Sequence, residues 1–290
     1  MTDGAAASGA AGRGRGLALV LALPGAFLAA FCVTPVLLLV QISLAHRDAG
    51  AFWSAGLELT QYRQLADPVF LRVAAFSLSL AAATALLTVG CAFPAAYFIS
   101  RMRRRAQVAW LVFLLGALSL SETLIVFAFQ VLLSSGGVLV KALLGLGLID
   151  TPRALYPNLA ALLACLVYLA LPYVILFLYP AVSQLDEEMP QAAATLGASP
   201  LGAFLRVTTP ILRGPLLTAA ALVAVFTVSS YLAALVLGRP EQWTVGVHLS
   251  NTALDAGDMP LAAAQAVALV AVLALLAAGV RGLGRARRTP

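Results

Sequence analysis

One ionisable side chain lies inside a long apolar run of this sequence. Glu122 interrupts the otherwise uncharged stretch Val108–Leu133. A charge near the bilayer centre costs about 2.5–3.5 kcal/mol on insertion scales, so such residues usually face a bundle interior or a water-filled path. Ser119, Thr123 and Gln130 fall near the same face at helical spacing. This stripe predicts a polar path that suits a cationic solute.

The same residues also admit a structural interpretation. Glu122 would then be protonated, or hydrogen-bonded between helices. A second polar group, Ser229, Ser230 and Tyr231, lies in another apolar run. It is compatible with either a path or a helix–helix hydrogen bond, and both interpretations stay open for both groups.

The chain lacks the residue patterns of common enzymes. Its only lysine, Lys141, follows a valine, so there is no G-x-x-x-x-G-K-[ST] phosphate-binding loop. His46 and His248 lie between the apolar runs and form no pair with metal-ligand spacing. The three cysteines have no paired spacing either: Cys32, Cys91 and Cys165. We therefore expect no enzymatic activity, no metal site and no cofactor of the chain's own.

The composition is that of a membrane protein. Hydrophobic residues make up 62% and charged residues 10% of 290 positions, against about 45–50% and about 25% in soluble domains. Six apolar runs are each long enough to span a bilayer. They are Leu17–Leu44, Val73–Ile99, Val108–Leu133, Leu159–Val182, Pro215–Leu237 and Leu261–Val280. Since backbone groups in lipid must pair internally, we expect an all-α bundle of six transmembrane helices.

Positive charge divides the connecting segments into two sets. Six lysines and arginines lie in one set, and twelve arginines lie in the other, here called the inner set. The inner ones are Arg13, Arg15, Arg101, Arg103, Arg104, Arg105, Arg206, Arg213, Arg281, Arg285, Arg287 and Arg288. The positive-inside rule predicts that the inner segments, and with them both termini, are cytoplasmic.

These boundaries predict the organisation of the chain. Residues 1–16 are expected to be a disordered cytoplasmic tail, and 17–72 the first helix with an outer loop. Residues 73–280 form the main transmembrane domain, and 281–290 a second cytoplasmic tail. The outer segments 45–72 and 134–157 have room for short helices. The inner loop 183–214 is the only inner loop long enough to hold structure of its own.

That inner loop has a distinctive pattern. Asp186 can cap a helix, and Ala193 and Gly197 follow four residues apart, on one helical face. Gln191-Ala192-Ala193 is followed by three residues, Gly197, nine residues and Val207-Thr208-Thr209-Pro210. This spacing resembles the signature loop of bacterial ABC importer permeases, Glu-Ala-Ala, three residues, Gly, nine residues, Ile-x-Leu-Pro. The departures are Gln191 for the acid and Thr209 for the leucine.

The resemblance covers roughly residues 60–280. Further segments resemble the same family, and its spermidine/putrescine branch in particular. They are Ser77–Ala81, Pro94–Tyr97, Leu146–Pro152, Val167–Tyr168, Leu171–Pro172 and Met259–Ala264.

Several expectations follow from the resemblance. It implies a type I ABC importer permease bundle in the bacterial inner membrane, with the first helix as an accessory anchor outside the core. The implied partners are ATP-binding subunits that bind the nucleotide, a second and different permease, and a periplasmic solute-binding protein. The residues implied to couple to the ATPase are Gln191, Ala192, Ala193, Gly197 and Pro210.

The resemblance favours a polyamine or a related cationic or polar compound as the solute. Related branches leave opines, phosphonates, thiamine and ferric iron open. Two other classes of protein also stay open from the residues alone: an ion-coupled secondary carrier, and a membrane scaffold that transports nothing. A carrier would need paired intramembrane charges and an internal repeat, and a scaffold would not need the small-residue loop.

Overall fold

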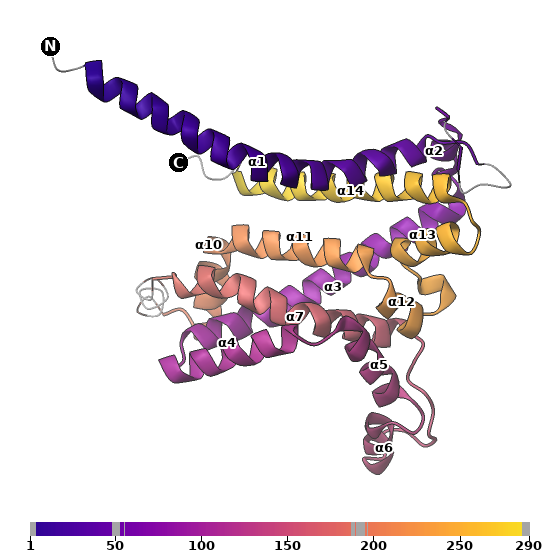
Figure 1. Cartoon of the computed structure of the whole chain (residues 1–290). Helices are drawn as coiled ribbons and strands as arrows, with labels where there is room; N and C mark the ends of the chain where they lie inside the picture. The colour runs from indigo at the N-terminus through magenta and orange to yellow at the C-terminus, as the bar shows by residue number, and fades with distance from the viewer. Residues whose placement is uncertain are drawn as a thin grey trace. The chain divides into compact units, whose positions relative to one another are not determined.

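The protein is helical throughout the part that its structure describes. The computed structural model (Figure 1) describes residues 4–47, 53–54, 56–186, 189, 195 and 197–285. In those ranges it contains helices and one isolated bridge, between His46 and Ser54, but no strand. The chain divides into two compact units. One contains Met1–Leu65 and Thr252–Ala268, and the other Ala66–Asn251 and Leu269–Pro290.

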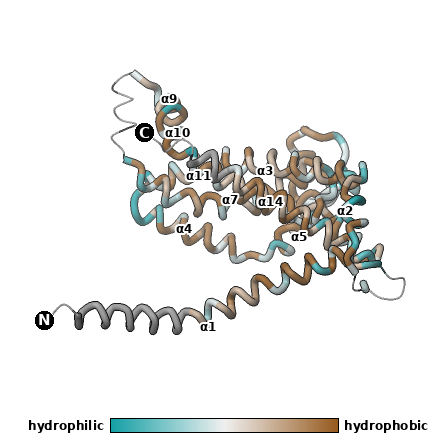
Figure 2. The backbone as a smooth tube through the Cα atoms, turned by 90° about the horizontal axis from the view of Figure 1, so that it is seen from above, coloured by the Kyte–Doolittle hydropathy of each residue, from teal (hydrophilic) through white to brown (hydrophobic). Residues whose placement is uncertain are grey.

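Within the described residues, five helical segments are long and apolar enough to cross a membrane. They are Pro24–Ser43, Pro68–Ser100, Glu122–Gly145, Leu159–Ser183 and Met259–Gly279. A bent pair, Pro200–Ile211 and Arg213–Ser229, raises the number to six if it counts as one span. Hydrophobic residues dominate α3 and α7, whereas the turn between α3 and α4 is hydrophilic (Figure 2). The prediction of an all-α, multi-span membrane protein is confirmed.

The first unit contains α1 (Gly4–Ser43), α2 (Thr60–Gln64) and the first turns of α14 (Met259–Arg285). The helical backbone of α1 begins at Gly4. That residues 1–16 form a tail separate from the first span stays a prediction. Helix α2 confirms the expected short helix in the 45–72 segment.

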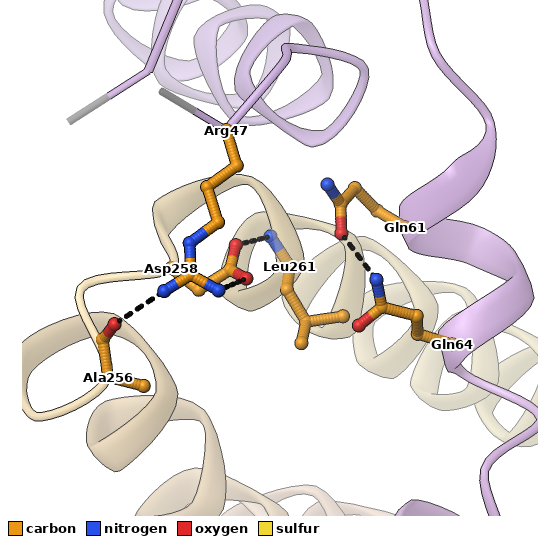
Figure 3. A network of polar contacts seen from close by, with 6 residues as sticks. All are labelled: Arg47, Gln61, Gln64, Ala256, Asp258 and Leu261. Atoms are coloured by element: carbon orange, nitrogen blue, oxygen red, sulfur yellow. Dashed lines mark hydrogen bonds and ion pairs between the residues drawn. The ribbon is translucent and has the colours of Figure 1, made fainter. Parts of the chain in front are cut away.

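An ion pair joins the segment after α1 to the start of α14 (Figure 3). Arg47 Nη1 lies 3.0 Å from Asp258 Oδ2, and Arg47 Nη2 donates to the carbonyl of Ala256. The other carboxylate oxygen of Asp258 accepts from the backbone N–H of Leu261. The side chain of Asp258 is only 7% exposed, so one buried carboxylate both caps α14 and holds Arg47.

The second unit is built on three long helices, α3 (Pro68–Ser100), α7 (Leu159–Ser183) and α11 (Arg213–Ser229), which pack against one another (Figure 1). Fully buried alanines lie at their contacts: Ala92, Ala96 and Ala219. Small side chains let helix backbones approach closely, which is how helices associate where lipid supplies no hydrophobic drive.

Shorter helices surround this group. Helix α4 (Arg104–Leu118) contacts α3 and α7, and α5 (Glu122–Leu133) and α12 (Leu232–Leu237) pack on α7. Their shared apolar cluster includes the buried Val126, Leu162, Leu166 and Leu237. Helix α6 (Val138–Gly145) contacts α5 and lies in the 134–157 segment, where a short helix is expected, but together with α5 it also forms the apolar segment Glu122–Gly145. The remaining elements are α9 (Pro200–Ala203), η1 (Phe204–Thr208), α10 (Thr209–Ile211), η2 (Pro240–Gln242) and α13 (Val245–Leu254).

Two predicted spans are not continuous helices. The run Val108–Leu133 is divided between α4 and α5, and Pro215–Leu237 between α11 and α12. Length and hydropathy predict that such runs span the membrane, but they do not detect interruptions of two or three residues. In both places the interruption contains serine, which competes for backbone hydrogen bonds and favours helix ends.

The histidine of α13 sits beside α3. The His248 ring lies 6.0 Å from the Phe70 ring, between centroids. Burial lowers the pKa of His248 below its ordinary value of 6.5, and the nearby Asp67 carboxylate opposes this by favouring the charged form. The neutral imidazole is therefore the form that suits the fold.

The Asp258 contacts predict a graded loss of stability. Asp258→Asn retains a capping oxygen but loses the ion pair, whereas Asp258→Ala loses both. We expect Asn to lower the free energy of unfolding by about 0.2–1 kcal/mol, and Ala by about 1 kcal/mol more. Thermal unfolding in detergent measures both, with the exposed Asp255→Asn as control. Equal melting temperatures for all variants and the wild type would contradict the assignment.

His248 predicts a pH dependence of stability. Its folded pKa is below the unfolded one, so the unfolded chain binds the proton more tightly. The free energy of unfolding should therefore fall as the pH drops below 6.5, and this contribution should be absent above that range. Comparing the pH dependence of unfolding for wild type and His248→Gln isolates it. A steeper loss in the variant would contradict the sign.

Candidate functional site

The first helix break separates Ser119 from Glu122. Helix α4 ends at Leu118, and the Ser119 hydroxyl donates back to the Leu115 carbonyl at 3.1 Å. Ser121 has extended backbone (φ −64°, ψ 135°) at the N-cap position of α5, and Glu122 is the first residue of that helix. A carboxylate in the first turn is stabilised by the helix dipole by roughly 0.3–1 kcal/mol.

This break changes the predicted polar stripe. Ser119 ends one helix, while Glu122, Thr123 and Gln130 belong to the next, so the four do not share one helical face. Glu122 and Gln130 are half-buried, and Ser119 and Thr123 are exposed. Serine followed by an acidic residue is a helix-start signal. This signal is present in the sequence at Ser121 and Glu122, but the length of the apolar run Val108–Leu133 favours one continuous helix.

Thr123 lines an open groove on the outside of α5. The groove has a volume of about 710 Å³, and its walls are almost entirely apolar. It is lined by Ser121, Thr123, Leu124, Phe127, Ala128, Val131, Leu132 and Val138. Glu122 is not among these residues, so the groove that Thr123 lines does not include Glu122.

The second break contains the other predicted polar group. The Ser229 hydroxyl donates to the Val225 carbonyl at 2.8 Å, a local bond that tends to bend helices. Ser230 is extended (φ −62°, ψ 124°) and ends α11, and Tyr231 precedes α12 and is 40% exposed. Within the described residues the Ser230 hydroxyl is buried without a hydrogen-bond partner. The carbonyl of Ser230, rather than any hydroxyl of this group, makes the contact to a neighbouring element.

Distant residues hold the second break in place. The Thr244 hydroxyl donates to the Ser230 carbonyl, and the next N–H, of Val245, donates to Ser77 Oγ of α3 at 2.9 Å. Ser77 and Thr244 are fully buried. A Cβ on Gly246 would lie 3.0 Å from the Ser229 carbonyl oxygen, a tight contact that a side chain could make only if the backbone shifted, so glycine suits this close approach. Sequence reasoning missed Thr244 and Gly246, whose partners lie far along the chain.

The inner loop is described in part. Gln191, Ala192 and Ala193 lie outside the described residues, whereas Met189, Thr195 and Gly197 are described, the first two as helical. Gly197 has φ +88°, a left-handed conformation typical of the residue that follows a helix. A Cβ there would meet no atom within 4 Å. In the described part, backbone conformation rather than crowding accounts for this glycine.

The segment after Gly197 bends sharply into α11. Ser199 Oγ accepts from the N–H of Gly202 and caps α9. Residues Phe204–Thr208 form a π-helical turn, and Pro210 follows in α10. The segment Pro200–Ile211 meets α11 at 77°. The loop thus reaches the bundle through a sharp bend rather than as a straight helix, and we call the segment Pro200–Ile211 the elbow.

Metal chemistry finds no support in the part of the chain that the structure describes, where no group of three His, Cys, Asp or Glu is placed to hold an ion. The described cysteines, Cys32, Cys91 and Cys165, are free thiols.

Proteins of known function with similar sequences are permeases. The spermidine/putrescine transport system permease protein PotB of Escherichia coli (strain K12) is 27% identical over 250 residues, 86% of this chain and 91% of PotB. PotB of Haemophilus influenzae is 25% identical over 258 residues, 89% of this chain and 90% of that protein. The molybdenum transport system permease protein ModB of Azotobacter vinelandii is 30% identical over 176 residues, 60% of this chain and 76% of ModB.

A solved structure shares the fold. It is that of a bacterial alginate ABC transporter in complex with alginate pentasaccharide-bound periplasmic protein, with a TM-score of 0.74, 13% identity, and coverage of 94% of this chain and 95% of that chain. Residues 92–287, well over half of the chain, match the family described as binding-protein-dependent transport system inner membrane component. The chain therefore belongs to that family: it is a multi-pass permease component of an ABC importer in the inner membrane, and not an enzyme.

Proposed function

We propose that this permease carries a small cationic or polar solute of the polyamine type, delivered by a periplasmic binding protein. The observation that carries the proposal is Glu122 at the break between α4 and α5. A broken helix leaves backbone groups and a carboxylate free to meet a solute, which an unbroken apolar span does not. The PotB relatives support the same class of cargo.

The uptake experiment described below also distinguishes solutes of other classes. Opines, phosphonates, thiamine and ferric iron are cargoes of related branches, and one relative is a molybdenum permease. A carboxylate at the path disfavours an anionic cargo by like-charge repulsion. The ion-coupled carrier and the scaffold have no support from the family to which the chain belongs.

Partners follow from the family. ABC permeases of this kind work with ATP-binding subunits, a second permease and a periplasmic binding protein. We propose that the second permease is a different chain, and that ATP is bound by the partner subunits alone. The excess of arginine on the inner segments supports cytoplasmic termini. That the first helix is an accessory anchor stays a prediction.

We propose that the inner loop couples the bundle to the ATPase. Gln191, Ala192, Ala193, Gly197 and Pro210 carry the motif. The left-handed Gly197 supports a helix that stops at a defined point, and α10, which contains Pro210, is joined to α11 through the single residue Leu212. In this role the loop moves with the ATPase, and its residues catalyse nothing.

Glu122→Gln should lower uptake of cationic solutes about tenfold, or about 1.4 kcal/mol, because it removes the charge and keeps the shape. The assay is uptake of labelled spermidine and putrescine into proteoliposomes containing the complete importer and its binding protein. Glu241→Gln makes the same change at an exposed outer position and is the matched control. Unchanged uptake of every cation tested would remove Glu122 from the path.

Gly197 variants separate two reasons for the glycine. If the left-handed backbone matters, Gly197→Asn should retain more transport than Gly197→Ala, because asparagine tolerates this region better. If a small contact face matters, Ala should be the better substitute. Gly197→Trp should abolish co-purification with the ATP-binding subunits and leave membrane insertion intact. Wild-type transport by Gly197→Trp would refute the coupling role.

A further inference from the structure

An aromatic cluster joins the inner elbow to the end of α3. The Phe204 ring stacks on Phe93 with centroids 4.6 Å apart and planes at 26°. Its face also meets Tyr97 edge-on, at 5.2 Å and 73°. Phe93 and Tyr97 are four residues apart and so share one face of α3. One turn further, the Arg101 guanidinium lies over the Tyr97 ring at 5.3 Å. We call Phe93, Tyr97, Arg101 and Phe204 the aromatic bracket.

The backbone around Phe204 has a defined reason for its shape. Pro210 has no N–H, and in an α-helix its ring would clash with the carbonyl of Arg206. The chain widens instead into the π-turn Phe204–Thr208. Both the backbone N–H and the hydroxyl of Thr209 donate to the Phe204 carbonyl, the latter at 3.0 Å. Phe204 is thus held from its own backbone as well as by its ring.

The inner end of α3 is also held from the other side. Gln107 Nε2 donates to the carbonyls of Ser100 and Met102 at 2.8 and 2.9 Å. Its Oε1 accepts from the Tyr179 hydroxyl of α7 at 3.2 Å. The end of α3 is therefore tied to α7, and a displacement applied to α3 at Phe93 and Tyr97 is shared with α7.

We propose that Phe204 is a positioning residue that transmits movement of the inner loop to α3, in parallel with the direct covalent route into α11. The inference rests on the proposed coupling role of the inner loop. The 77° bend favours a second route, because a displacement along the elbow does not run along the axis of α11. The Phe204 ring passes this displacement sideways to α3, through its contacts with the buried Phe93 and the half-buried Tyr97.

The test uses the complete importer in proteoliposomes with its binding protein, and four variants of this chain. Phe204→Ala removes the ring. Phe204→Leu keeps an apolar side chain of similar bulk but lacks the flat aromatic face, whereas Phe204→Tyr keeps the aromatic ring. Leu205→Ala changes a neighbour in the same π-turn that is 54% exposed and outside the bracket. The readouts are co-purified ATP-binding subunits, ATP hydrolysis, and solute imported per ATP hydrolysed.

Phe204→Ala and Phe204→Leu should lower the solute imported per ATP about tenfold, within the usual range of coupling between sites. Both should retain their ATP-binding subunits and their basal ATP hydrolysis. Phe204→Tyr and Leu205→Ala should behave as the wild type. Because Phe204→Leu preserves apolar volume, it carries the test if the alanine variant does not fold.

Three results separate the possible failures. Unchanged import per ATP in Phe204→Leu overturns transmission through the ring. Loss of the ATP-binding subunits from both Phe204→Ala and Phe204→Leu overturns it too, since Phe204 would then be a docking residue. If the wild-type permease neither retains ATP-binding subunits nor needs ATP for uptake, the proposed function itself fails, whatever the variants do.

Discussion

The structure depends on the requirement that backbone N–H and C=O groups inside a membrane find partners within the protein. A continuous helix meets it without help. This chain breaks two of its apolar runs and must supply partners from elsewhere. At Ser230 the partner is the hydroxyl of Thr244, and the adjoining N–H of Val245 finds Ser77 of α3. The break is thereby part of the packed bundle and not a loose joint.

The same requirement explains the kinds of residue found near the breaks. A serine at a helix end can donate its hydroxyl to a carbonyl of the preceding turn, as Ser119 does to Leu115 and Ser229 does to Val225. Glycine lets a second backbone come close, as Gly246 does beside Ser229. None of these residues is charged, so the breaks leave the hydropathy of the run nearly unchanged. Glu122 is the exception, and it occupies the helix end where a negative charge is best tolerated.

Sequence patterns predicted the class of fold because composition and run length depend only on the bilayer. The lengths of the segments 45–72 and 134–157 indicated room for short helices, and α2 and α6 lie there. They did not predict the breaks, because the donor to the Ser230 carbonyl lies 14 residues beyond it, at Thr244. The acceptor for the next N–H, of Val245, lies on another helix, at Ser77. The motif located Gly197, but its left-handed backbone is a conformational property that spacing does not report.

The contact between Val245 and Ser77 has a consequence for the assembly of the protein. Synthesis proceeds from the N-terminus, so α3 is made well before Val245, which lies 168 residues beyond Ser77. Until Val245 arrives, the Ser77 oxygen lacks the N–H from which it accepts in the finished protein, and its hydroxyl can bond only within its own helix, to the Val73 carbonyl. The second break is therefore fastened to α3 late in synthesis, by a helix that has waited with its acceptor unused.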